Sequence, residues 1–442
     1  MRKAPKWILK ASTSIILLSL SSHTLASGIR LGLDSAADLG NQFAGGAALA
    51  GDASTNYYNP AAMTVLNQQQ IVGSAIGVIP RIQFKGTVTS PGFGRPPLLP
   101  ANPSSQTGST TSTFKGVIPA IHYMIPLGQK WRAGMTVNTP FGLGLNYGKD
   151  SLLRYTTITA IDRSFNLGPS LAYRINEHWS IGGGPDFQYF SVYSYAKVNT
   201  QFLTANDSDQ KNFANGWGYG GHIGGLYEVN KGTRIGLAYH SQIVHHLSGK
   251  SMFNLNNLNP ALTPFIPNPN FTSESLRINI TLPAFTTLSA YHEINNKWAV
   301  MGTAEFTQWN TLRTIHAFGA VTPTGLTDAV QDQYFRNTWR FSGAANYRAN
   351  DHWLLRAGAG LDQLATNSTD RTAYIPDSER INVSVGTRYD INKQAALDLA
   401  YSHSFGKKAW INHLDKNSGV TENGFTSTQA DVIGVQLLWN IV

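Results

Sequence analysis

The segment "RINVSVGTRYDINKQAALDLAYS" (residues 380–402) decides the fold, because apolar and polar side chains alternate along both of its halves. Successive side chains of a β-strand point to opposite faces, so this alternation predicts two strands that each have one apolar face. A turn at Lys393-Gln394 would place Arg388 opposite Asp398, both pointing inward. The apolar face of the first half consists of Ile381, Val383, Val385, Thr387, Tyr389 and Ile391.

Five other short turns resemble the one at 391–395, and four of them end in tryptophan. They are "PLGQKW" (126–131), "INEHW" (175–179), "VNKGT" (229–233), "INNKW" (294–298) and "ANDHW" (349–353). Each interval between turns holds two strands and a longer polar excursion, so five intervals give ten strands. Two more strands precede the first turn and two follow the last, which makes fourteen, and a closed antiparallel barrel requires an even number. A ring of tryptophans at one level is typical of a membrane interface.

The composition favours a membrane barrel over a soluble β-sandwich. Charged residues make up 13% of the chain and aromatic residues 11%, whereas roughly 25% of an ordinary soluble domain is charged. Beyond the first 26 residues no run of 18 apolar residues occurs, which excludes helical membrane spans. The absence of cysteine excludes a disulfide scaffold and a cysteine nucleophile.

The first 26 residues have the pattern of a secretory signal peptide. Four basic residues within 2–10 precede an apolar stretch at 15–20 and a small-residue cleavage site at 24–26. Removal of residues 1–26 lowers the formal net charge from +9 to +5, because it takes four positive charges and no negative ones. Such a mild basic excess argues against a nucleic-acid partner.

Residues 27–66 contain too little side-chain bulk to form a lipid-facing strand. Small residues allow backbone to pack closely against backbone, so this segment is predicted to fill the lumen of the barrel formed by residues 67–442. The small residues are Gly40, Gly45, Gly46, Gly51, Ala36, Ala37, Ala44, Ala47, Ala48, Ala50 and Ala53.

The chain resembles the long-chain fatty-acid transport family of the outer membrane, the FadL type, which includes channels for aromatic hydrocarbons. The resemblance implies a fourteen-stranded barrel with an N-terminal hatch, in the outer membrane of a Gram-negative bacterium. It also implies a monomer surrounded by outer-membrane lipid, with no cofactor and no enzymatic activity. The segments that carry it are 35–63, with the motif Asn59-Pro60-Ala61, and 139–147, 152–155, 166–184, 282–300 and 375–392.

The resemblance further implies a route for the cargo. A hydrophobic molecule is captured by the outer loops and leaves sideways into the bilayer through a gap at a kink in the third strand. The corresponding residues here are Pro140, Phe141, Gly142 and Gly144. Proline has no N–H for the ladder and glycine admits a bulge, so a local break in pairing is reasonable. Asn59 is expected to bond ladder groups freed at this kink and, with Pro60 and Ala61, to gate the hatch.

One outer loop, residues 254–275, is unusually apolar for a surface segment. Its apolar residues could form a landing surface for an apolar ligand or fold into a small core of their own, and both interpretations stay open. They are Leu255, Leu258, Leu262, Phe265, Ile266 and Phe271. A cation for an anionic head group could come from Lys197, Arg380 or Arg388, and nothing in the sequence selects one.

Uptake of long-chain fatty acids by passive diffusion is the function predicted, and aromatic or alkane hydrocarbons are the alternative cargo. An outer-membrane lipid hydrolase would need a Ser/His pair near the rim, and none stands out in the sequence. A water-filled porin would lack the hatch and carry a charged constriction. No metal site is expected, since adjacent His245 and His246 would point to opposite faces of a strand.

Overall fold

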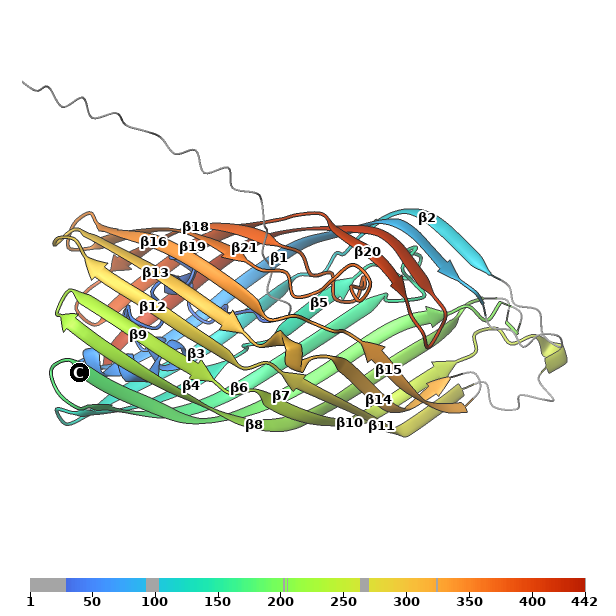
Figure 1. Cartoon of the computed structure of the whole chain (residues 1–442), viewed down its shortest axis with the longest axis horizontal. Helices are drawn as coiled ribbons and strands as arrows, with labels where there is room; N and C mark the ends of the chain where they lie inside the picture. The colour runs from blue at the N-terminus through green and yellow to red at the C-terminus, as the bar shows by residue number, and fades with distance from the viewer. Residues whose placement is uncertain are drawn as a thin grey trace, which may run out of the picture.

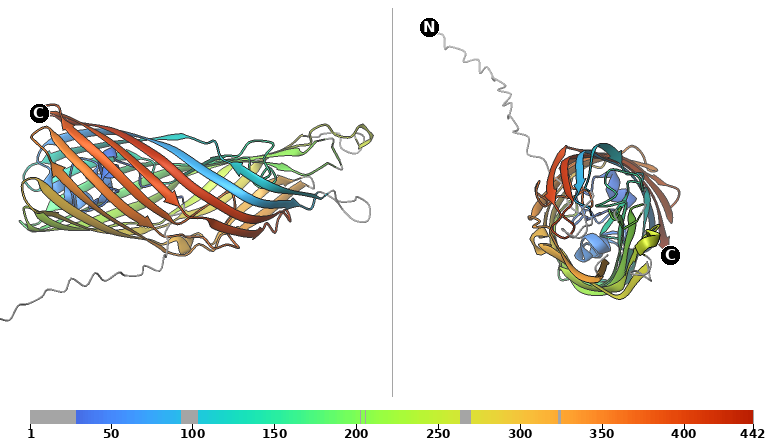
Figure 2. Two further views of the ribbon diagram at one scale, coloured as in Figure 1. Left: turned by 90° about the horizontal axis from the view of Figure 1, so that it is seen from above. Right: turned by 90° about the vertical axis from the view of Figure 1, so that its right-hand side faces the viewer.

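A closed antiparallel barrel forms the body of the protein. The computed structural model describes residues 29–92, 103–201, 203–204, 206–262, 270–322 and 325–441. The barrel closes because the first strand, β1 (Gln69–Ser90), pairs along nearly its whole length with the last, β21 (Thr421–Ile441) (Figure 1). Viewed along its axis, the wall surrounds the N-terminal helices (Figure 2). The expected signal peptide lies outside the described residues.

The wall has fourteen strand positions within the described residues, as predicted. Seven are continuous: β1, β6 (Thr159–Arg174), β7 (Trp179–Val198), β8 (Ser208–Asn230), β17 (Trp353–Asp362), β18 (Arg380–Asp390) and β21. Seven consist of two successive segments: β2 (Ser104–Thr111) with β3 (Gly116–Leu127), β4 (Trp131–Asn138) with β5 (Gly142–Asn146), β9 (Thr233–His240) with β10 (Ile243–Asn254), β11 (Asn270–Leu282) with β12 (Phe285–Glu293), β13 (Trp298–Thr307) with β14 (Thr314–Thr322), β15 (Gly325–Asp332) with β16 (Thr338–Arg348), and β19 (Ala395–Gly406) with β20 (Ala409–Leu414).

The hairpin of β18 and β19 confirms the predicted alternation. Arg388 is paired with Asp398 in register. Val385 is 57% exposed, whereas the neighbouring Ser384 is 5% exposed. An outer face of exposed apolar side chains in a wall whose inner face is polar and buried is the surface that lipid would cover.

Four tryptophans mark the end of the barrel where the short turns lie, at the left in Figure 1. Each is the first residue of its strand and stacks on a tyrosine of the neighbouring strand, with ring centroids 4.5–4.8 Å apart. Their exposed fractions are 41–52%. They are Trp131, Trp179, Trp298 and Trp353. An aromatic ring at this level fits a membrane interface, because indole is apolar with one N–H that bonds water.

The N-terminal segment lies inside the barrel, in the half nearest the short turns (Figure 1). It contains α1 (Ala36–Gly40), α2 (Thr55–Tyr58) and a 3₁₀ turn, η1 (Pro60–Val65). We call residues 29–66 the hatch. Two other 3₁₀ turns, η2 (Pro260–Leu262) and η3 (Trp309–Thr311), belong to connections of the wall. None of the described helices is long and apolar enough to cross a membrane.

Candidate transport site

The third strand position of the wall is interrupted at Pro140, where the sequence analysis expects a kink. β4 ends at Asn138 and β5 begins at Gly142. The ladder with β6 pairs Asn138 with Asn166 and then Gly142 with Arg163, so the third strand has one extra residue across the break. An extra residue bends a strand and leaves ladder groups without their regular partners.

On the other side of the break the wall lacks part of its hydrogen-bond ladder. β3 pairs with β4 only from Ile121 to Leu127, and residues 116–120 keep only their pairing with β1. Within the described residues no ladder pair joins β3 to β5. The two segments meet again at the far end of β5, where the N–H of Thr113, just before β3, donates to the carbonyl of Asn146 at 2.9 Å. We call this unpaired stretch between β3 and β5 the wall gap.

The first described residues of the hatch occupy the wall gap from inside. Arg30 forms an antiparallel bridge with Phe141. The Leu31 N–H donates to the Pro140 carbonyl at 2.9 Å, and the Gly142 N–H donates to the Ile29 carbonyl at 3.0 Å. The hatch therefore supplies the backbone partners that β3 does not.

Two glycines of β5 leave space for side chains at the wall gap. A Cβ added to Gly142 would lie 2.9 Å from Leu31 Cδ1, and one added to Gly144 would overlap the ring of Phe114. Gly142 and Gly144 lie on the opposite face of the strand from Phe141, whose side chain is buried in the lumen. Glycine is thus required here for close approach rather than for backbone conformation.

The expectation that Asn59 forms hydrogen bonds at the kink is wrong. Its amide N–H₂ donates to the Ala47 carbonyl at 2.7 Å and to the Gly225 carbonyl at 3.0 Å. Its side-chain oxygen accepts the Ala61 N–H at 3.1 Å and so caps η1, with Pro60 at the first helical position. Asn59 therefore holds the hatch to β8, while Ile29 and Leu31 serve the kink.

Three glycines on adjacent strands form the surface on which the Asn-Pro-Ala motif rests. A Cβ on Gly182 of β7 would lie 2.7 Å from the Ala61 nitrogen. A Cβ on Gly224 of β8 would overlap the Asn59 side chain, and one on Gly236 of β9 would overlap the Ala47 carbonyl. We call Gly182, Gly224 and Gly236 the glycine seat. Their lack of side chains sets how closely the hatch approaches this wall.

Beyond the hatch, the lumen contains two apolar clusters. The inner cluster includes Phe141, Phe190 and Trp309, all buried. The outer cluster includes Phe84, Leu145 and Leu153. Leu143 and Tyr374 pack against both clusters and so connect them. Apolar packing thus continues from the outer half of the lumen to Phe141 at the wall gap. A pocket beside Phe141 is lined on one side by apolar residues such as Leu282 and Phe285 and on the other by polar residues that include Asp186 and His240.

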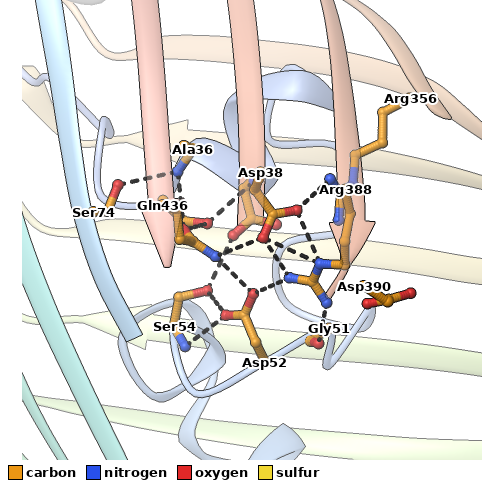
Figure 3. Close-up of polar contacts among 12 residues, drawn as sticks. Ala36, Asp38, Gly51, Asp52, Ser54, Ser74, Arg356, Arg388, Asp390 and Gln436 are labelled. Atoms are coloured by element: carbon orange, nitrogen blue, oxygen red, sulfur yellow. Dashed lines mark hydrogen bonds and ion pairs between the residues drawn. The ribbon is translucent and has the colours of Figure 1, made fainter. Parts of the chain in front are cut away.

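Of the three candidate head-group cations, Arg388 is already engaged. Its guanidinium lies 2.8 Å from carboxylate oxygens of both Asp52 and Asp398 (Figure 3). Arg356 bonds the other oxygen of Asp398 at 2.6 Å, and the amide of Gln436 donates to Asp52 at 2.9 Å. This network ties the hatch, through Asp52, to β17, β18, β19 and β21, so Arg388 serves as an anchor for the hatch.

Asp38 of α1 lies beside this network. Burial raises the pKa of its carboxyl to about 7, and the nearby charge of Asp52 adds to the rise. Asp52 and Asp398 already balance the two guanidinium groups of Arg356 and Arg388, so a protonated Asp38 completes a neutral network.

The other two candidate cations lie elsewhere. Lys197 is near the outer end of β7, opposite Asp209 in register, and Arg380 begins β18 opposite Asp362. Within the described residues neither forms an ion pair within 4.0 Å. The sequence predicted Arg388 opposite Asp398 but could not show that Asp52 of the hatch also pairs with Arg388, which is what distinguishes it from Lys197 and Arg380.

The structure describes only some of the apolar side chains of the 254–275 loop, and those pack in a cluster. Leu255 is buried, and Leu258 and Phe271 pack with it against Phe253 and Val321. These contacts fit a small apolar core that the loop shares with neighbouring segments, since Val321 belongs to β14. Phe265 and Ile266 lie outside the described residues, and for Leu262 only the backbone is described.

A serine, a histidine and an aspartate meet in the lumen, which sequence reasoning missed. Ser170 Oγ lies 2.7 Å from His222 Nε2, and His222 Nδ1 lies 2.9 Å from Asp186 Oδ2. The three are buried inside the barrel at 8%, 7% and 4% exposure, and not at the rim where a hydrolase acting on surface lipid would need them. They come from three strands, so no local motif could reveal them.

The comparison with known proteins fits this architecture. A family model described as outer membrane protein transport protein (OMPP1/FadL/TodX) matches residues 17–440. The chain belongs to this family. Its members are transport channels of the Gram-negative outer membrane and not enzymes, and this chain shares that location and class.

Several relatives resemble the chain over most of its length. It is 26% identical to a long-chain fatty acid transport protein of Salmonella typhi, over 91% of this chain and 93% of the relative. It is 28% identical to a 47 kDa outer membrane protein of Pasteurella multocida, over 89% and 90%. Among solved structures, a Pseudomonas aeruginosa FadL homologue superposes with a TM-score of 0.80 at 20% identity, covering 94% of this chain and 100% of the homologue. The Pseudomonas putida toluene transporter TodX superposes with a TM-score of 0.63 at 16% identity, covering 88% and 94%.

Proposed function

We propose that this channel takes up long-chain fatty acids and releases them sideways into the outer membrane through the wall gap. The observation that carries the proposal is the unpaired stretch between β3 and β5, next to which the apolar lumen ends at Phe141. The backbone hydrogen bonds across this gap in the described part of the chain are the two made by Ile29 and Leu31, and these can break without unzipping the barrel.

Passive movement along this route is physically reasonable. An acyl chain entering the lumen gains about 0.8 kcal/mol for each methylene removed from water, so the apolar clusters favour its entry. Leaving through the wall gap exchanges one apolar environment for another, and no energy source is required. The carboxylate would need a cation, and Lys197 and Arg380 remain the candidates, since Arg388 is engaged.

The remaining partners follow from the barrel itself. The exposed apolar face of the wall, Val385 and Leu399 among it, would contact outer-membrane lipid. All fourteen strand positions close within one chain, so the channel would function as a monomer. The apolar loop 254–275 would capture the ligand before it enters the lumen.

Hydrocarbons are the second candidate cargo, because the toluene transporter TodX has the same fold. The fatty acid is favoured because two relatives that match 91% of this chain are named long-chain fatty acid transport proteins.

Uptake of labelled oleate and labelled toluene by cells that lack their own transporter distinguishes the two cargoes. We expect expression of this chain to raise oleate uptake severalfold and toluene uptake much less. Toluene uptake without oleate uptake would assign the hydrocarbon instead. A failure to raise either would contradict the proposal.

A further inference from the structure

A carboxylate and two imidazoles converge in the lumen beside the pocket at the wall gap. Asp186 comes from β7, His222 from β8 and His240 from the end of β9, and all three are buried. Asp186 Oδ2 lies 2.9 Å from His222 Nδ1 and 3.8 Å from His240 Nδ1. One donor atom from each residue lies within 4.8 Å of the other two. Each side chain can therefore offer one ligand atom to a common point.

The second nitrogen of each ring already has a partner. His240 Nε2 lies 3.0 Å from the Tyr57 carbonyl of the hatch. A carbonyl can only accept, so Nε2 carries the proton and the neutral ring presents the lone pair of Nδ1 to Asp186. His222 Nε2 bonds Ser170 Oγ at 2.7 Å, and the Asn166 amide donates to the other oxygen of Asp186 at 2.9 Å.

This arrangement leaves one interaction that a hydrogen bond does not satisfy. A lone pair on His240 Nδ1 and a carboxylate oxygen of Asp186 face each other at 3.8 Å, and both are electron donors. A cation between them satisfies both. A metal-ligating histidine is commonly oriented by a hydrogen bond from its other ring nitrogen to a backbone carbonyl, as His240 Nε2 makes here.

We propose that Asp186, His222 and His240 bind one divalent transition-metal ion of the Zn²⁺ class. Two imidazole nitrogens and one carboxylate oxygen form a ligand set suited to zinc, whereas Mg²⁺ and Ca²⁺ prefer oxygen ligands alone. Asp186 and His240 also line the pocket next to Phe141, which provides space for a water ligand.

The surrounding charges permit a cation here. Arg30 stacks over Phe285 at 3.7 Å, and Phe285 stacks in turn on His240 with ring centroids 4.5 Å apart. The positive charge of Arg30 is balanced by its ion pair with Glu305. The carboxylate of Asp186 therefore remains available to neutralise part of the charge of a bound metal.

Bound metal would strengthen the attachment of the hatch to the wall. It would join β7, β8 and β9 at a point where His240 also bonds the Tyr57 carbonyl. Because this ion would lie beside the wall gap, it would stabilise the closed hatch. The inference concerns binding alone and holds whichever cargo the channel carries.

Metal content of the purified protein tests the site directly. The full-length channel, carrying an affinity tag without histidine, is stripped with a chelator, exposed to equimolar Zn²⁺ and freed of unbound metal by gel filtration. We expect about one Zn²⁺ per chain, and Co²⁺ in its place should give the visible absorption of an imidazole-ligated ion. Mg²⁺ should neither bind nor displace Zn²⁺.

Matched variants separate the site from adventitious binding. Asp186→Asn and His240→Gln should each lower the bound Zn²⁺ at least tenfold, and His222→Gln serves if either fails to fold. His245→Gln is the control, because His245 is also buried in the lumen but bonds Gln188 instead. Folding of each variant is checked by the heat-dependent shift of a closed barrel on a gel. Substoichiometric Zn²⁺ in the wild type, or equal Zn²⁺ in the Asp186 and His240 variants, would overturn the proposal.

Discussion

Asn59 connects three backbone segments through one side chain. Its amide bonds the Ala47 carbonyl within the hatch and the Gly225 carbonyl of the wall, and its oxygen caps η1. Asn59 is fully buried, so each bond is formed away from competing water. Removing a donor so that a buried carbonyl is left unsatisfied costs about 1–3 kcal/mol. The residue therefore matters more for positioning the hatch than its size suggests.

Replacement of Asn59 by alanine should disturb the hatch without unfolding the barrel. The strand ladders involve none of its side-chain bonds, so the Asn59→Ala variant should insert and shift on a gel as the wild type does. Oleate uptake should fall severalfold, because the hatch loses its fixed attachment to β8. Normal uptake by this variant would show that Asn59 has no part in the function of the hatch.

The sequence identified Asn59 but not its partners. The pattern Asn-Pro-Ala within a small-residue segment is visible locally, whereas Gly225 lies 166 positions away along the chain. A residue 166 positions away becomes a neighbour only when the hatch enters the barrel, so the expectation drawn from the family resemblance named the wrong partner, at the kink. For Arg388, one partner was predictable and the other was not. Its pairing with Asp398 follows from the local hairpin, whereas its contact with Asp52 of the hatch does not.

At the scale of elements, the glycine seat sets where the hatch rests against the wall. Gly182, Gly224 and Gly236 lie on three adjacent strands, and each faces the hatch where a side chain would collide with it. The wall gap depends on glycine in the same way, through Gly142 and Gly144. Close backbone approach, rather than turn geometry, explains why these strands contain glycine at positions that weaken a strand.

Two neighbouring glycines of β8 provide a matched test of the seat. Gly224 faces the hatch, and Gly224→Ala should push Asn59 away, which costs about 1–3 kcal/mol as overpacking does. Gly225 points away from the lumen, and the nearest atom to an added Cβ is 4.0 Å away. We expect Gly224→Ala to lower both the melting temperature in detergent and oleate uptake, and Gly225→Ala to change neither. Equal effects of the two substitutions would show that the glycine seat does not set the position of the hatch.

Strand periodicity predicted the strands well, because the alternation of apolar and polar side chains along a strand with one lipid-facing side is a local property. Together with the recurring short-turn motif it gave the fourteen strand positions and the six short turns, whereas the break at Pro140 was expected from the family resemblance. What fills the break could not be predicted, since Ile29 and Leu31 reach it from over 100 residues away. The cluster of Asp186, His222 and His240 was missed for the same reason.

At the scale of the whole molecule, the hatch is held on two sides of the barrel. The network of Asp52, Arg388 and Asp398 attaches it to β18 and β19, and the glycine seat receives it at β7, β8 and β9. Among the described residues of the hatch, Ile29, Arg30 and Leu31 contact the wall gap, through two backbone hydrogen bonds and the packing of their side chains. Opening of the gap therefore requires local movement of residues 29–31, while most of the hatch stays in place.

A reversible disulfide across the wall gap tests this claim most directly, since the chain has no cysteine of its own. Arg30 and Phe141 form an antiparallel bridge pair, and the Cα atoms of such pairs lie about 4.5–5.5 Å apart, within disulfide range. The double variant Arg30→Cys/Phe141→Cys is made in a Glu305→Gln background, which avoids an unpaired buried carboxylate.

A second disulfide, far from the gap, serves as the control. The hydroxyl oxygens of Thr64 and Ser180 lie 2.8 Å apart, so Thr64→Cys/Ser180→Cys joins the other end of the hatch to β7. Oleate uptake is then measured for both variants, oxidised and reduced. We expect oxidation to block uptake when residues 30 and 141 are joined and reduction to restore it, whereas the control should transport in both states. Equal uptake by the oxidised and reduced forms of the variant joined at 30 and 141 would contradict lateral release through the wall gap.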